Sequence, residues 1–326
     1  MRRAALAATA AVLLLVPAFV TTPYFIHILV LTGMYIVLAL SYDLSVGQVG
    51  VLSLAHPAFF GTGAYTAAIL AVDYSGAPLL ALGLGAVLAS VLAVAIGVPS
   101  FRLSEHSFAI GTLGFALIAE LVARNWIGVT RGPMGIPGIP RPVILGVRVS
   151  TLVDFYYLML VMLGLAVAFY RALTTSRVGR AFRAVREDEV LAASAGVSPQ
   201  KYKMIAFVVG AAMAGVMGVF YAWWFTIVSP EQLTMYYTVN LLIIVFIGGR
   251  GSLRGVILGA VIFTAVPEFL RIAPQARLIL YGFILLASVH YFPDGLEGLL
   301  RRLFRPRSAP VVSTVGREGD VTRDVR

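Results

Sequence analysis

The chain has 326 residues, of which 60% are hydrophobic and 12% charged, and its formal net charge at pH 7 is +10. Soluble domains carry about 25% charged residues, so this composition excludes an ordinary soluble globular protein. The absence of cysteine excludes a disulfide framework, a cysteine-based zinc site and a thiol nucleophile. The basic residues lie between apolar segments and near the C-terminus, which the positive-inside rule of membrane proteins explains better than nucleic-acid binding does.

Apolar segments recur along the chain and predict an all-α, polytopic integral membrane protein with about ten transmembrane helices. The first is interpreted as an uncleaved helix, because Pro17-Ala-Phe-Val-Thr-Thr is a poor match to a signal-peptide cleavage site. The eighth is too short for a bilayer of about 30 Å, and the glycines after it indicate a broken or re-entrant segment. The predicted segments are 4–22, 26–45, 51–72, 79–98, 108–124, 152–171, 204–227, 239–249, 255–271 and 277–293.

The charges between these segments predict the orientation. If Arg2 and Arg3 are cytoplasmic and the chain alternates sides, the charged loop 172–203 and the C-terminal tail also lie inside. The loop 125–151 then lies outside, although it contains three arginines. We therefore expect a single transmembrane domain over 1–300 and a basic, disordered cytoplasmic tail over 301–326, with both termini in the cytoplasm.

The charged loop has helix start and stop signals. Ser176 is a favourable N-cap, and Gly196 is placed to end a helix because glycine accepts the left-handed conformation of a C-cap. Ser198 and Pro199 then form a second start signal, with proline at the first helical position. The pattern predicts a helix, a glycine turn and a second helix that enters the membrane.

The charges of this loop suggest what it contacts. Arg183 and Glu187 are four residues apart, and Arg186 and Glu189 are three apart, so we expect two ion pairs on one helical face. One interpretation is an amphipathic helix lying on lipid headgroups. The acidic run that includes Asp188 favours a groove in another protein instead, because anionic headgroups would repel it.

At this loop the sequence resembles a known family. Residues 179–197, GRAFRAVREDEVLAASAGV, are similar to the cytoplasmic loop of ABC-importer permeases for branched-chain amino acids, in particular the second, M-type subunit of those heteromeric systems. Three further segments resemble the same family in the same order along the chain. They are Gly47–Ala67 (GQVGVLSLAHPAFFGTGAYTA), Gly132–Pro142 (GPMGIPGIPRP) and Phe246–Leu270 (FIGGRGSLRGVILGAVIFTAVPEFL).

The resemblance implies a permease domain in the bacterial plasma (inner) membrane whose charged loop is a coupling helix for cytoplasmic ATPases. It implies a heterodimer with a second related permease, two ABC ATPase subunits and an extracytoplasmic binding protein, surrounded by membrane lipid and without nucleic acid. ATP hydrolysis would reside in the partners, so the chain is expected to be no enzyme and to bind no cofactor. By this resemblance the ATPase contact would consist of Arg180, Arg183, Arg186, Glu187, Asp188, Glu189 and Gly196.

The glycine-rich segments also indicate that partner subunits, and not this chain, bind ATP. Gly248–Gly255 lacks the Gly-Lys-[Ser/Thr] ending of a phosphate-binding loop, and Gly61–Gly63 lacks the third glycine of a dinucleotide fingerprint. We therefore expect no nucleotide site in this chain.

A stretch rich in small residues is the candidate translocation path. A helix broken here would leave backbone groups available to a zwitterionic cargo, whereas close helix packing is the alternative. His56 lies within this stretch, and an ionisable side chain within a span usually faces the interior or a cavity. We do not expect His56 to bind a metal, because no second histidine or carboxylate lies at a suitable spacing. The candidate residues are Gln48, Ser53, His56, Gly61, Gly63 and Tyr65.

The outer loop is the candidate docking surface for the binding protein. It is too rich in glycine and proline to be helical, so a rigid loop that covers the bundle is the alternative. The candidate docking residues are Arg131, Gly132, Gly135 and Arg141.

The sequence leaves two alternative functions and the identity of the transported substrate undecided. Related permeases carry urea or short amides, so the cargo is open. An ion-coupled secondary transporter would need acids within the membrane, and only Asp43, Glu120 and Glu268 occur near segment ends. Asp43 is expected to end the second span, and Glu120 to pair with Arg124. A membrane enzyme would need clustered histidine, aspartate or cysteine side chains. The sequence does not decide whether the partner permease is a paralogue or a second copy.

Overall fold

The computed structural model describes residues 13–17, 19, 22–74, 76–144, 146–269 and 298, with side chains in the last long helix described up to Thr264. The predicted span 277–293 and the tail 301–326 lie outside these residues, as does most of the predicted span 4–22.

The predicted spans two to nine each correspond to one helix of an all-α, polytopic membrane fold. Helices α2 (with the turn that extends it), α4, α5, α7 and α10 are long and apolar enough to cross a membrane. Helix α11 has only 14 residues, which confirms the short eighth segment. The bounds are α2 (Pro23–Asp43), α3 (His56–Val72), α4 (Pro78–Ser100), α5 (Glu105–Asn125), α7 (Leu152–Thr175), α10 (Pro199–Phe225), α11 (Met235–Gly248) and α12 (Leu253–Phe269).

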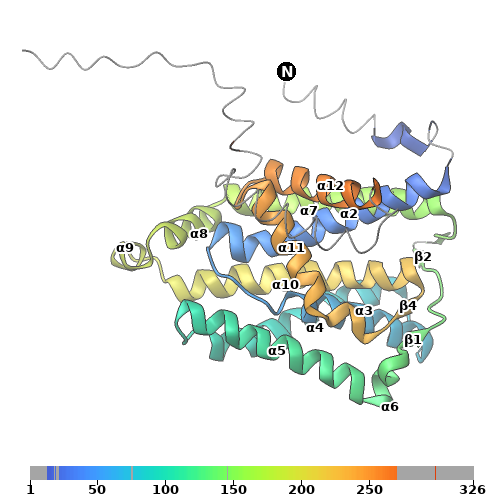
Figure 1. Ribbon diagram of the computed structural model, residues 1–326, viewed down its shortest axis with the longest axis horizontal. Helices are drawn as coiled ribbons and strands as arrows, with labels where there is room; N and C mark the ends of the chain where they lie inside the picture. The colour runs from blue at the N-terminus through green and yellow to red at the C-terminus, as the bar shows by residue number, and fades with distance from the viewer. Residues whose placement is uncertain are drawn as a thin grey trace, which may run out of the picture.

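The connections gather at two opposite ends of the bundle (Figure 1). At one end, here named the α9 end, lie α8 (Arg177–Glu187) and α9 (Glu189–Ser194). At the other, here named the strand end, lie short elements that the sequence did not predict. These are α6 (Ile127–Thr130), η2 (Gly132–Met134), β1 (Ile136–Pro137), β2 (Val143–Ile144), β3 (Val147–Arg148), β4 (Ile227–Val228) and η3 (Pro230–Leu233).

The strands form two small antiparallel pairs that order the predicted outer loop. Ile136 of β1 lies opposite Val228 of β4, which follows α10, so the loop is joined to the end of the central helix. Strands β2 and β3 form a hairpin with Val143 opposite Arg148. The loop is therefore a folded cap, as expected for a rigid covering segment.

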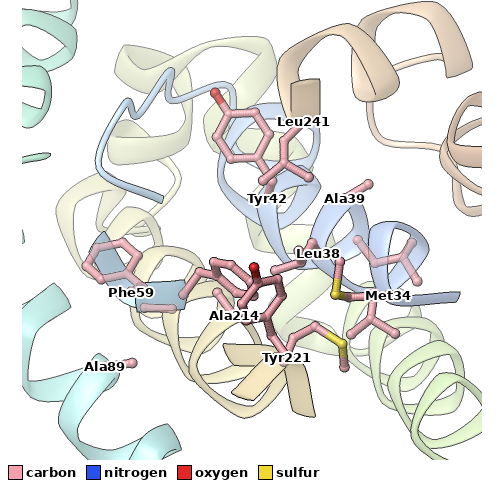
Figure 2. Close-up of a cluster of buried hydrophobic side chains, with 14 of the residues drawn as sticks. Met34, Leu38, Ala39, Tyr42, Phe59, Ala89, Ala214, Tyr221 and Leu241 are labelled. Carbon is pink, nitrogen blue, oxygen red and sulfur yellow. The ribbon is translucent and has the colours of Figure 1, made fainter. Parts of the chain in front are cut away.

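Helix α10 lies at the centre of the bundle, where it packs against α2, α3 and α4 (Figure 1). Figure 2 shows buried side chains of this core, among them Leu38 of α2, Phe59 of α3 and Ala214 of α10. Helices α4, α5 and α7 instead leave large apolar side chains exposed, such as Ile110 and Leu165. Apolar surface of this extent on long helices matches the hydrocarbon of a bilayer.

Glycines bring the central backbones unusually close. A Cβ on Gly63 of α3 would lie 1.9 Å from the carbonyl oxygen of Gly215 on α10. A Cβ on Gly215 would in turn lie 2.4 Å from the carbonyl oxygen of Gly85 on α4. No side chain fits between these helices, so glycine is required for the contact.

Adding one methyl group at Gly63 should destabilise the bundle. In a Gly63→Ala variant α3 and α10 must move apart, at a cost of about 1–3 kcal/mol, which thermal unfolding in detergent will measure. Gly83→Ala is the matched control, because a Cβ at Gly83 meets nothing within 4 Å. Equal melting temperatures for the two variants would contradict the close contact.

Candidate functional site

A stretch of non-helical backbone interrupts the bundle between α2 and α3. Helix α2 continues as one π-helical turn, η1 (Leu44–Gln48), and α3 begins only at His56. We name residues 49–55 the unwound segment. Non-helical backbone in a membrane bundle must find its hydrogen bonds within the protein or in a water-filled cavity. This is the broken element predicted for the candidate path.

Three helices supply hydrogen bonds to the unwound segment. The Tyr42 hydroxyl of α2 donates to the carbonyl of Ser53 at 3.0 Å. The Leu54 N–H donates to the Thr112 hydroxyl of α5 at 3.0 Å, and the Thr238 hydroxyl of α11 donates to the Leu54 carbonyl at 3.3 Å. These groups were expected to be available to a zwitterion. In this conformation they are occupied by side chains, so a ligand could reach them only by exchange.

His56 fixes the end of the unwound segment to α2. Its Nε2 atom lies 2.8 Å from the Ser41 hydroxyl, and the ring is only 2% exposed. Ser41 donates its single hydroxyl proton to the carbonyl of Leu38 at 2.7 Å, so the imidazole is the donor to Ser41. Tyr42 and Phe59 make T-shaped contacts with the ring at centroid distances of 5.1 and 6.0 Å. His56 is thus held in a packed interior as a positioned hydrogen-bond donor.

The other predicted path residues divide into two groups. Ser53 is 1% exposed and lies in the unwound segment, where its hydroxyl accepts the N–H of Ala55 at 3.2 Å. Gly61 and Gly63 lie against Leu233 and Gly215, so both serve close packing and favour that alternative. Tyr65, farther along α3, is 7% exposed, and among the described residues its hydroxyl has no hydrogen-bond partner. Gln48, 3% exposed, belongs to a separate polar cluster at the α9 end.

Asp43 belongs to that same cluster, and regular α-helix ends there as expected. Asp43 is 0% exposed, and its carboxylate is held by groups of the protein. It accepts hydrogen bonds from the Tyr170 hydroxyl and, at 2.8 Å, from the Gly251 N–H. Sequence reasoning missed Tyr170 and Gly251, because nothing local marks a partner more than a hundred residues away.

The charged loop is folded as predicted at both boundaries. The Ser176 hydroxyl accepts hydrogen bonds from the N–H groups of Val178 and Gly179, and Gly196 has a φ of +82°. Pro199 opens α10 as expected, although Ser198 makes no side-chain cap. The loop is therefore an ordered pair of short helices at the α9 end of the bundle (Figure 1).

The interior of this loop differs from the expectation. Asp188 breaks it, because its carboxylate caps α9 by accepting the N–H groups of Val190 and Leu191 at 2.8 and 2.9 Å. The predicted ion pairs do not form. Arg183 donates to the carbonyl of Thr174 at 2.9 Å, and Arg186 donates to the carbonyl of Gly47. Glu189 pairs with Lys203 instead.

The predicted ATPase contact therefore has two parts that face different ways. Arg180 and Glu187 are exposed, with no side-chain partner among the described residues, and Gly196 is exposed in its turn. Arg183 and Arg186 are exposed as well, but their guanidinium groups donate hydrogen bonds back to backbone carbonyls of the bundle. The most exposed apolar residues of the loop are Val190 at 81% and Leu191 at 67%, which the sequence reasoning did not single out. Two adjacent apolar residues directly after the acidic run were the available signal.

The predicted docking residues lie together at the strand end. Arg131, in the left-handed conformation with a φ of +60°, pairs with Asp73 at 3.1 Å. Gly135 contacts β4 so closely that a Cβ there would lie 2.1 Å from the carbonyl oxygen of Val228. Arg141 lies over the Phe155 ring, 5.9 Å from its centroid. Gly132, with a φ of +63°, begins η2.

Removing the Thr112 hydroxyl should loosen the unwound segment. A Thr112→Val variant leaves the Leu54 N–H without its acceptor, at a cost of about 1–3 kcal/mol. Hydrogen exchange followed by mass spectrometry should then be faster across 49–55. Thr62→Val is the matched control, because the Thr62 hydroxyl bonds only to the Ala58 carbonyl of its own helix. Equal exchange in the two variants would contradict this role of Thr112.

Comparison with known proteins connects this geometry to a family. The family model described as branched-chain amino acid transport system / permease component matches residues 24–289. The high-affinity branched-chain amino acid transport system permease protein LivM of Escherichia coli (strain K12) is 31% identical over 299 residues, which cover 85% of this chain and 70% of LivM. LivH of the same strain is 24% identical over 285 residues, 81% of this chain and 91% of LivH. No solved structure matches.

Proposed function

This chain belongs to the family of branched-chain amino acid transport permease components, and from that premise we propose that it is the permease subunit of an ATP-driven importer for branched-chain amino acids. The projecting α8–α9 element supports the ATP-driven part. A folded element that exposes Val190 and Leu191 to water is suited to insertion into a partner protein. The chain thus acts in transport, with ATP hydrolysis in partner subunits.

The comparisons support a heterodimeric permease. The chain is 31% identical to LivM and 24% identical to LivH of the same organism, so it corresponds to the M-type subunit. Its partner would be an H-type permease, a related chain rather than a second copy. Exposed apolar faces on α4, α5 and α7 leave surface for that partner and for lipid.

The two ends of the bundle have different partners in this proposal. The α9 end faces the cytoplasm and meets the ATPases, with Arg180, Glu187, Val190 and Leu191 at the contact. The strand end faces outward and receives the binding protein, with Met134, 83% exposed, beside the Arg131–Asp73 pair. Closure of the ATPases would move the α8–α9 element and switch the bundle between outward-open and inward-open states.

The unwound segment is the proposed transport path. Ser53, Leu54 and His56 present polar groups within an apolar core, a combination that suits a zwitterion with a branched aliphatic side chain. Their present partners are hydroxyl groups, which a passing amino or carboxylate group can replace one for one. The same exchange explains why the segment needs no permanent charge.

Reconstitution tests the function directly. The permease, its H-type partner, the ATPases and the binding protein are placed in proteoliposomes with labelled leucine. Uptake should require ATP and the binding protein, be blocked by vanadate and continue when a protonophore collapses the proton gradient. Uptake driven by an ion gradient without ATP would indicate a secondary transporter instead. Uptake of urea or acetamide in place of leucine would keep the importer class and change the cargo.

Charging the tip of α9 should separate the permease from its ATPases. Val190→Asp combined with Leu191→Asp should lower uptake and ATPase co-purification by about tenfold, because the partner's apolar pocket must then desolvate two carboxylates. Val147→Asp, at a 67% exposed residue of the strand end, is the matched control and should co-purify the ATPases normally. Normal co-purification by the α9 variant would show that the tip is not the contact.

A further inference from the structure

A polar cluster joins four elements at the α9 end, with Asp43, Gln48 and Tyr170 buried, Gly251 partly buried and Arg186 exposed. We name it the Asp43 cluster: Asp43, Gln48, Tyr170, Arg186 and Gly251. Asp43 holds Tyr170 of α7 and Gly251 of the α11–α12 turn by hydrogen bonds to its two carboxylate oxygens. Gln48 closes the ring, because its Nε2 atom donates to the Tyr170 hydroxyl oxygen at 2.8 Å and to the Gly251 carbonyl at 3.0 Å. Among the described residues, Asp43 is the one buried carboxylate.

Arg186 connects this cluster to α8. Its guanidinium donates to the carbonyl of Gly47, and its charge attracts the Asp43 carboxylate. A Cβ on Gly50 would lie 3.3 Å from the Cγ atom of Arg186, and a Cβ on Gly251 would lie 2.6 Å from its Nη1 atom. The Arg186 side chain therefore runs over Gly50 and ends against Gly251.

Gly47 and Gly251 allow the backbone before the unwound segment to lie directly against the backbone of the α11–α12 turn. A Cβ on Gly47 would lie 1.8 Å from the Oδ1 atom of Asp43 and 2.4 Å from the backbone nitrogen of Gly251. Gly251 has a φ of +76°, which favours glycine independently of the space around it. The backbones at Gly47 and Gly251 thus lie side by side, with Arg186 as the one side chain from α8 that reaches both.

We propose that the Asp43 cluster is the joint through which movement of the α8–α9 element reaches the transport path, with Arg186 and Asp43 as its positioning residues. The inference rests on the proposed function, since it assigns how the ATPase contact acts on the bundle. Gly47 and Gln48 immediately precede the unwound segment. A displacement of α8 that pulls on the Gly47 carbonyl therefore moves the start of residues 49–55.

The surroundings of α8 allow such a displacement. A cavity of about 270 Å³ is lined by Val185–Glu189, by Val49–Val51 of the unwound segment, and by Phe101, Leu103, Glu105 and Phe108 around the start of α5. The end of α8 thus faces open space on one side and the directional hydrogen bonds of the cluster on the other. Hydrogen bonds weaken steeply when their geometry changes, so a network of them switches between discrete arrangements.

The test measures the amount of leucine transported per ATP hydrolysed. This ratio distinguishes a residue that transmits movement within the permease from a residue that binds the ATPase. The complete importer is reconstituted with Arg186→Gln, which removes the charge from the joint, with Arg186→Lys, which keeps it, and with Tyr170→Phe, which removes one hydroxyl. Arg177→Gln, an exposed arginine at the start of the same helix, is the matched control. Leucine uptake, binding-protein-stimulated ATP hydrolysis and ATPase co-purification are measured for each.

For Arg186→Gln we expect normal co-purification, continued ATP hydrolysis and about a tenfold fall in leucine transported per ATP. Arg186→Lys should recover a large part of that ratio, and Arg177→Gln should leave it unchanged. Asp43→Asn added to Arg186→Gln should lower it little further, because both act in one network. Tyr170→Phe carries the same expectation should the Arg186→Gln permease fail to fold, which thermal unfolding in detergent would show.

Three results would overturn the joint. An unchanged ratio in Arg186→Gln and Tyr170→Phe would show that the cluster transmits nothing. Loss of ATPase co-purification by an Arg186→Gln permease that folds normally would make Arg186 part of the ATPase contact. An equal fall in leucine transported per ATP for Arg177→Gln would show that the loss of any positive charge on α8 has this effect. A wild-type complex without ATP-driven leucine uptake would instead overturn the proposed function.

Discussion

The structure depends on one constraint: inside the bundle, every backbone N–H and C=O that leaves a helix must find a partner within the protein. Helices satisfy this locally, but residues 49–55 do not form one. Tyr42, Thr112 and Thr238 meet the constraint for this segment from three different helices. Because the cost of an unpaired group is several kcal/mol in hydrocarbon, the fold can keep a break here only while these side chains stay in place.

Close helix packing follows from the same constraint. Carbonyl groups already bonded along a helix can be approached by a neighbouring backbone only where side chains are absent, and Gly63, Gly215 and Gly85 provide that approach. Helix α10 is thereby fixed between α3 and α4 as a rigid centre. The parts held by side-chain hydrogen bonds, the unwound segment and the Asp43 cluster, lie beside this centre rather than within it. Rigidity and exchange are thus assigned to different residues of the bundle.

Local features of the fold could be predicted from the sequence, and non-local ones could not. Apolar run length located eight helices, and the Ser176 cap, the turn at Gly196 and the pair between Glu120 and Arg124, 2.8 Å apart, each depend on neighbours in the chain. Asp43 finds its partners 127 and 208 residues away, so its role was invisible. The break of the charged loop at Asp188 was visible in principle. Aspartate is a strong N-cap, and here capping outweighed the expected side-chain pairs.

The candidate path residues also show that the sequence does not reveal contacts between distant helices. The sequence correctly indicated a broken helix near His56, because small residues, proline and a histidine occur together there. It could not separate residues that pack, such as Gly61, from residues that hold the break, such as Ser53. That distinction depends on which helix lies opposite, and the partners come from α5 and α11.

The unwound segment is therefore held at both of its ends, by Arg186 of α8 at the first and by Ser41 of α2 at the second. Gly47, which receives Arg186, lies just before it, and His56, which donates to Ser41, lies just after it. A segment fixed at two points by two different helices cannot move freely, but in the proposed mechanism it changes register against α5 and α11 when one fixed point shifts. In the proposed mechanism, movement of α8 acts on the first point and leaves the second in place. The proposed transport path is then altered by exchanging a few hydrogen bonds, without disrupting the apolar core that keeps the bundle folded.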